Sequence, residues 1–278
     1  MPEALWPILF AVFVWWFSTG LVLLLDGLPR TTFRWSHLIS SVLAVAALVG
    51  LHRTAGQTDV ASAYCAFTCA LLVWGWHELS FLTGWVTGPR RQALSAGAEG
   101  WKRFAEGTLT LLWHELAILA TGVLIAVLTW GEANQVGVGT YAVLWLMRIS
   151  AKLNVFYGVR NLSLQFLPPH LRYLGSYFRK RSMNLLFPFV VTAATAVAVM
   201  LVREALAQPA GSAEAIGAWL VSTLLALAIL EHWLLVLPLE ATALWRWAMH
   251  KPSSGQAASV VKPVAVTLDS DDKLLHAR

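Results

Sequence analysis

The stretch Trp74-Gly75-Trp76-His77-Glu78 decides the fold, because it places a histidine and a glutamate inside a long apolar segment at about 60–84. An ionisable side chain at the centre of a membrane helix costs roughly 2.5–3.5 kcal/mol on insertion scales. Such residues are therefore rare within membrane spans and are functional by default. The stretch predicts a membrane helix that contributes to an intramembrane site.

The same pattern recurs in other apolar segments. It returns as Trp113-His114-Glu115 in the segment at about 105–130, and in reverse as Glu231-His232-Trp233 in the segment at about 214–245. The segment at about 136–160 carries Arg148, Lys152 and Asn154. Arg148 and Lys152 are four residues apart and therefore share one helix face. We expect the four helices to bring these polar side chains to one layer of the bundle.

Composition identifies the class of protein. The 278 residues are 58% hydrophobic and 13% charged, with a mean hydropathy of +0.63, whereas a soluble domain carries about 25% charged residues. The chain is predicted to be an all-α, polytopic membrane protein, with residues 1–248 in a single transmembrane bundle. The tail at 249–278 is rich in Ser, Lys, Asp and Ala and is predicted to be disordered in the cytoplasm. Seven spans are predicted, at about 4–25, 36–52, 60–84, 105–130, 136–160, 184–206 and 214–245.

The distribution of basic residues predicts the orientation. With seven spans, 16 of the 20 Lys and Arg residues fall on one side of the membrane, and only Arg53 and Arg203 fall on the other. The positive-inside rule then places the N-terminus outside and the C-terminus in the cytoplasm. Because the basic residues lie in loops beside spans, they indicate topology and no nucleic-acid partner.

The layer of His and Glu side chains has several interpretations. A buried ion-pair network with Arg148 and Lys152 would fix helix register without any chemistry. A proton or ion pathway is a second interpretation. A non-haem metal site, for iron, manganese or zinc, is a third, with Glu78, Glu115, Glu231, His77, His114 and His232 as ligands. The spacing departs from a di-iron bundle, whose signature is Glu-x-x-His, because here the two residues are adjacent.

A tetrapyrrole site is the fourth interpretation. A neutral histidine within a membrane bundle can ligate haem iron or the magnesium of a chlorophyll-type pigment, and His77, His114 and His232 are the candidate axial ligands. Tryptophan rings suit the walls of a site for a flat conjugated ligand. Trp76, Trp113 and Trp233 are the candidate aromatic walls, and Lys152 and Asn154 are candidate polar contacts at the same depth.

A separate feature lies at about 169–182. Pro168 and Pro169 can start a helix, and Leu171, Leu174 and Phe178 then recur at helical spacing among basic residues. This pattern predicts a short amphipathic helix on the cytoplasmic leaflet, attracted to anionic lipid. Docking of a partner protein is the alternative.

Several long motifs resemble a known family over roughly residues 5–248. They are Trp15-Trp16-Phe17-Ser18-Thr19-Gly20, Trp74-Gly75-Trp76-His77-Glu78, Leu146-Met147-Arg148, Ser150-Ala151-Lys152-Leu153-Asn154-Val155-Phe156, Phe166-Leu167-Pro168, Ser176-Tyr177-Phe178, Met183-Asn184-Leu185-Leu186-Phe187-Pro188 and Glu231-His232-Trp233. The chain is thereby similar to the photosynthetic complex assembly family PuhE of purple phototrophic bacteria, encoded beside the reaction-centre H subunit. The resemblance implies an intracytoplasmic inner-membrane protein whose partners are reaction-centre and light-harvesting subunits, membrane lipid and bacteriochlorophyll.

Two functional hypotheses follow. The first is a non-catalytic factor that assembles the photosynthetic complexes or handles bacteriochlorophyll, with the His/Glu layer binding a tetrapyrrole or a metal. The second is a membrane enzyme, a di-iron-like oxidoreductase that uses non-haem iron to oxidise a lipophilic pigment precursor. Neither catalysis nor a particular cofactor is assigned by the sequence alone.

Overall fold

The computed structural model describes residues 2–239 and 241–248, so the predicted disordered tail at 249–278 lies outside the described residues. The described residues form seven α helices and no strand, which confirms the all-α prediction. They are α1 (Pro2–Asp26), α2 (Phe33–Ala55), α3 (Val60–Leu82), α4 (Gly100–Leu128), α5 (Val136–Tyr157), α6 (Leu186–Ala207) and α7 (Ala213–Val236). There are also four short 3-10 helices, η1 (Arg30–Thr32), η2 (Leu164–Phe166) and η3 (Pro169–Tyr177) between α helices and η4 (Ala241–Trp245) after α7.

Six helices among the described residues are long and apolar enough to cross a membrane. They are α1, α2 with the preceding η1, α3, α4, α6 and α7. The remaining helix, α5, falls outside this group because Arg148, Lys152 and Asn154 lower its hydropathy. These helices make the chain a multi-pass membrane protein, while the count of seven spans and the orientation stay predictions.

Local chemistry explains where the helices begin and end. The Asp59 carboxylate accepts hydrogen bonds from the backbone N–H of Ser62 at 3.0 Å and from its hydroxyl at 2.7 Å, which caps the start of α3. Ser212 caps α7 in the same way. Helix α7 ends at Val236 because Leu237 precedes a proline and is extended. The predicted span at 214–245 is therefore too long at its C-terminal end.

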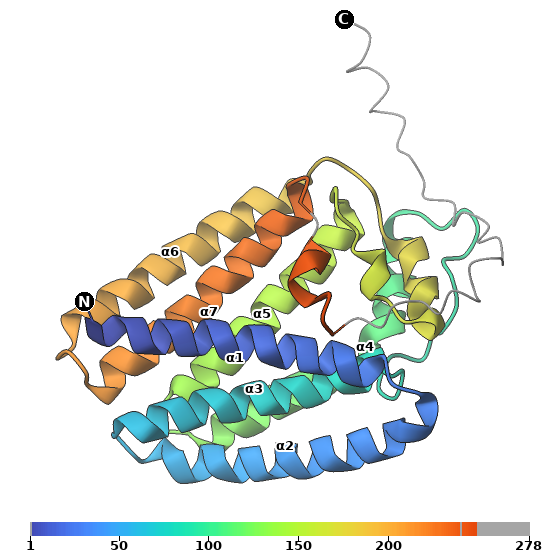
Figure 1. Cartoon of the computed structure of the whole chain (residues 1–278). Helices are drawn as coiled ribbons and strands as arrows, with labels where there is room; N and C mark the ends of the chain where they lie inside the picture. Colours follow the sequence, from blue (N-terminus) through green and yellow to red (C-terminus); the bar gives the residue numbers. More distant parts are fainter. Residues whose placement is uncertain (1, 240, 249–278) are drawn as a thin grey trace, which may run out of the picture.

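Helix α3 lies between α1 and α2 (Figure 1), and it also contacts α5 and α7. Of the residues in the most apolar part of α3, 67% are buried within the protein, against only 11% in that of α1. This difference marks α1 as a peripheral helix and α3 as a helix enclosed by protein. Helix α2 pairs with α3, and α6 pairs with α7 (Figure 1).

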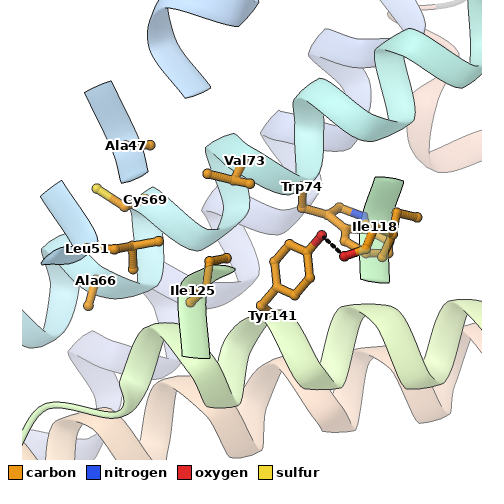
Figure 2. Close-up of a cluster of buried hydrophobic side chains, with 9 residues drawn as sticks. All are labelled: Ala47, Leu51, Ala66, Cys69, Val73, Trp74, Ile118, Ile125 and Tyr141. Carbon is orange, nitrogen blue, oxygen red and sulfur yellow. Dashed lines mark hydrogen bonds between the residues drawn. The ribbon is translucent and has the colours of Figure 1, made fainter. Parts of the chain in front are cut away.

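A hydrophobic core joins α2, α3, α4 and α5 on one side of α3 (Figure 2). Its buried members are Ala47, Leu51, Ala66, Cys69, Val73, Trp74, Ile118, Ile125 and Tyr141. The Tyr141 hydroxyl donates a hydrogen bond of 3.0 Å to the carbonyl of Ile118, which satisfies the polar end of the ring and ties α5 to α4 (Figure 2).

The segment between α5 and α6 packs onto one end of the bundle. The predicted helix at about 169–182 is a shorter 3-10 helix, η3, which ends at Tyr177. Its Leu171 and Leu174 are buried against Phe81 and Leu82 of α3. The apolar side of η3 therefore faces protein, and contact of this segment with the lipid leaflet stays a prediction.

Arg103 fastens this segment to the bundle. The residue is only 5% exposed. Its guanidinium donates a hydrogen bond to the carbonyl of Phe156 at 2.7 Å and another to the carbonyl of Tyr177. The same guanidinium lies 3.7 Å from the centre of the Phe156 ring. Arg103 thus joins α4, the end of α5 and η3.

Candidate functional site

Two ion pairs connect α5 to its neighbours. Arg148 lies 2.7 Å from Glu78 of α3, and Lys152 lies 2.5 Å from Glu115 of α4. The four-residue spacing places both cations on one face of α5, so that each meets a carboxylate on a different helix. Two of the three glutamates from the His-Glu pairs are therefore neutralised by partners.

The third glutamate is arranged differently. Glu231 of α7 accepts a hydrogen bond of 3.2 Å from the indole N–H of Trp15 on α1. Among the residues that the structure describes, Glu231 forms no ion pair, since the three pairs involve Glu106, Glu78 and Glu115. Glu231 is therefore a half-buried carboxylate whose contact is a neutral donor.

A cavity of about 480 Å³ lies between the helices, and Glu78, Arg148, Lys152 and Glu231 are among its lining residues. The rest of the lining is largely apolar and comes from α1, α3, α4, α5, α7 and the 3-10 helices η2, η3 and η4. Along α5 the lining runs from Val143 to Phe156, a helical length of about 20 Å at 1.5 Å per residue. The cavity is thus long and apolar, with charged groups along its wall.

The histidines lie outside this cavity. Of the described residues that line it, none is His77, His114 or His232, although each of these is only 1% exposed. The His232 ring is held on both sides, with one nitrogen 2.8 Å from the Ala228 carbonyl and the other 2.5 Å from the Ser150 hydroxyl. Within the pairs on α3 and α7, it is the glutamate that faces the cavity.

His77 and His114 lie close to each other in the packing between α3 and α4. Their ring centres are 6.5 Å apart, and the His114 ring lies 4.7 Å from that of Phe81. Within the described structure, Nε2 of His77 and both ring nitrogens of His114 have no hydrogen-bond partner. Because the cavity does not reach these rings, the geometry does not support them as axial ligands of a tetrapyrrole bound there.

The predicted aromatic walls also lie outside the cavity. The Trp76 indole donates to the Ser41 hydroxyl at 2.9 Å, and Trp113 and Trp233 are 53% and 42% exposed. Trp15, Trp74 and Trp245 line the cavity in their place. The spacing could have indicated Trp74, because it lies four residues before Glu78 and so on the same helix face.

Asn154 holds two helices together and does not line the cavity. Its side chain is fully buried, and its amide group donates to the Ser150 carbonyl at 2.9 Å and accepts from Asn184 at 3.0 Å. Asn184 also accepts from the backbone N–H of Leu186 at the start of α6. Asn154 therefore helps to join α5 to α6, while Lys152 is the predicted polar contact that reaches the cavity.

The six predicted metal ligands do not come together. Among the described residues, no group of three or more His, Cys, Asp or Glu side chains is placed to hold a metal ion. The physical reason is that Glu78 and Glu115 form ion pairs with Arg148 and Lys152, and that the three histidines are buried outside the cavity. Binding of a non-haem metal ion by these six residues together stays a prediction.

Comparison with known proteins finds a matching family and a similar protein. The family model described as "Protein of unknown function (DUF3623)" matches residues 1–256, which include every cavity residue named above. A protein of Rhodobacter capsulatus, named "Uncharacterized 30.4 kDa protein in puhA 5'region", is 42% identical over 259 residues. The alignment covers 91% of this chain and 93% of the relative. No solved structure shows a significant match to the chain.

Proposed function

This chain belongs to the DUF3623 family, and from that premise we propose that it is an integral membrane factor for the assembly of photosynthetic complexes. In this proposal it holds a bacteriochlorophyll-type tetrapyrrole within the bundle and supplies it to reaction-centre and light-harvesting subunits. The observation that carries the proposal is the cavity of about 480 Å³ between the helices. Its volume falls within the range of about 300–1,000 Å³ found for small-molecule sites.

The lining fits the chemistry of such a pigment. A tetrapyrrole of this class has a flat conjugated ring and a long hydrocarbon tail. The apolar lining that extends about 20 Å along α5 suits the tail, and the rings of Trp15, Trp74 and Trp245 suit the macrocycle. A few polar groups in a mostly apolar wall are what orients a ligand in a small-molecule site.

The gene neighbourhood supports the same biological role. The printed name of the R. capsulatus relative places it in the 5' region of puhA, which agrees with the neighbourhood that the PuhE resemblance implies. We extend the proposal to the topology that the basic residues predict. In it the chain has seven spans in the inner membrane, with a periplasmic N-terminus and a cytoplasmic C-terminus.

The other interpretations have less support. The ion pairs of Arg148 and Lys152 agree with a register-fixing network, but such a network requires no elongated cavity beside it. The oxidoreductase hypothesis requires a cluster of metal ligands, and the described residues contain none. We therefore do not propose it as a second function.

A cavity-filling substitution tests the proposal. Ala151 lines the cavity, and Ala151→Leu adds three carbon atoms to its wall. Ala196, on the exposed outer face of α6, gives the matched control Ala196→Leu. In the native bacterium we expect Ala151→Leu to lower the absorbance of assembled reaction-centre and light-harvesting complexes in the membranes, with unchanged amounts of the chain itself. Normal complexes at a normal level of the Ala151→Leu chain would overturn the proposal.

A further inference from the structure

We propose that Glu231 is the residue that coordinates the magnesium of the bound pigment, through the carboxylate oxygen that Trp15 does not engage. This inference rests on the proposed function, because it assigns a role within the same cavity. It concerns a different residue type from the histidines that the sequence indicates as axial ligands.

Charge balance singles out Glu231. The cavity is lined by two carboxylates and two cations. The Glu78 carboxylate is neutralised by Arg148, and Lys152 is neutralised by Glu115 from outside the cavity wall. Glu231 is left as the lining carboxylate without an ion pair among the described residues, and Arg148 attracts it only from beyond ion-pair distance. A carboxylate in apolar surroundings is costly unless an electropositive group meets it.

Accessibility separates Glu231 from Glu78. In Glu78, one carboxylate oxygen binds Arg148, and the other is buried without a hydrogen-bond partner in the described structure. In Glu231, one oxygen accepts from Trp15, and the residue keeps partial exposure. The indole hydrogen bond fixes the carboxylate at the cavity wall and leaves its second oxygen for a ligand.

The chemistry of magnesium agrees with this choice. Mg²⁺ is a hard cation that prefers oxygen ligands, and in a chlorophyll-type ring it keeps an open axial position. The His232 ring beside Glu231 cannot serve, because both of its nitrogens are engaged by Ala228 and Ser150. The carboxylate of Glu231 is therefore the oxygen donor that the cavity offers to the metal.

The decisive experiment compares two pigments that differ only in the metal. The purified full-length chain in detergent is titrated with bacteriochlorophyll a and with its magnesium-free form, bacteriopheophytin a, and binding is followed by the shift in pigment absorbance. We expect the wild-type chain to bind the magnesium form at least about tenfold more tightly. We expect Glu231→Gln, which keeps an acceptor for Trp15, to reduce this preference, and Glu231→Leu to abolish it.

Glu204→Gln is the matched control, since Glu204 is exposed on α6 and contacts Gln208; it should keep the wild-type preference. A preference that survives in Glu231→Leu, or equal binding of both pigments by the wild-type chain, would overturn the assignment of Glu231 and leave the pigment cavity standing. If neither pigment binds the wild-type chain, the proposed function itself fails, and the assignment fails with it.

Discussion

Replacement of Asn184 by alanine should cost more stability than any exposed substitution, because Asn184 lies at a buried junction of three chain segments. Its amide nitrogen lies 3.0 Å from the Asn154 side-chain oxygen, 3.2 Å from the Asn154 carbonyl and 2.9 Å from the Gly158 carbonyl. Its oxygen accepts from the backbone N–H of Leu186 at 2.9 Å. The residue is only 8% exposed, so water cannot replace these contacts.

The magnitude follows from the number of bonds. The amide has two hydrogens and therefore donates about two full hydrogen bonds to its three acceptors, and it accepts one more. At about 1 kcal/mol net for each bond, Asn184→Ala should lower the free energy of unfolding by roughly 3 kcal/mol. The loss is a large fraction of the 5–15 kcal/mol that is typical of a folded protein.

Denaturant unfolding in detergent, followed by tryptophan fluorescence, measures this loss. Gln208→Ala is the matched control, because the side-chain amide of Gln208 donates its hydrogen bond to the exposed Glu204 carboxylate. The control should change the free energy of unfolding by no more than about 0.5 kcal/mol. A loss below about 1 kcal/mol for Asn184→Ala would refute the view that this junction holds α6 to α5.

Other substitutions test other contacts. Arg148→Met leaves the Glu78 carboxylate without its cation and should lower the free energy of unfolding by about 1–3 kcal/mol, between the values for exposed and buried pairs. In a double-mutant cycle, the further change Glu78→Gln should restore part of this loss. Additive losses from the two substitutions would argue against the ion pair. Arg103→Met removes the donor to two carbonyl groups and should speed proteolysis within 158–178. A proteolysis rate equal to that of the wild type would contradict this role of Arg103. Burial lowers the pKa of His170 below its ordinary value of 6.5, so the unfolded chain binds more protons and stability should fall as the pH falls through about 6.5. Stability curves at pH 5–7.5 for the wild type and His170→Gln check this, and equal slopes would contradict it.

The helices could be predicted from the sequence because hydropathy is a property of each segment alone. All seven predicted apolar segments overlap helices of the structure, α5 included. The errors lie at the ends of the predicted spans, because a single residue can end a helix. Pro238, for example, ends α7 well before the predicted residue 245. The pattern at 169–182 has helical spacing, but its apolar residues Leu171 and Leu174 pack on the bundle, a contact that no local pattern contains.

The site could be predicted only in part. The pairing of Arg148 with a glutamate follows from residue type and from the high cost of unpaired charge in a membrane. Which member of each His-Glu pair faces the cavity depends on the rotation of each helix, and adjacent residues differ by about 100° around the axis. The sequence pattern indicated Trp76, His77 and Glu78 alike, and of these only Glu78 lines the cavity, with Trp74 as the tryptophan beside it.

Whether the cavity holds a pigment is tested most directly by the pigment content of the purified chain. The chain is extracted gently from its native membrane, and its absorbance spectrum and magnesium content are measured per mole of protein. We expect a bacteriochlorophyll-type spectrum and about one equivalent of magnesium per chain, one for each cavity, with both reduced in Ala151→Leu. Pigment-free protein from membranes rich in bacteriochlorophyll, or pigment that stays unchanged when the cavity is filled, would contradict it.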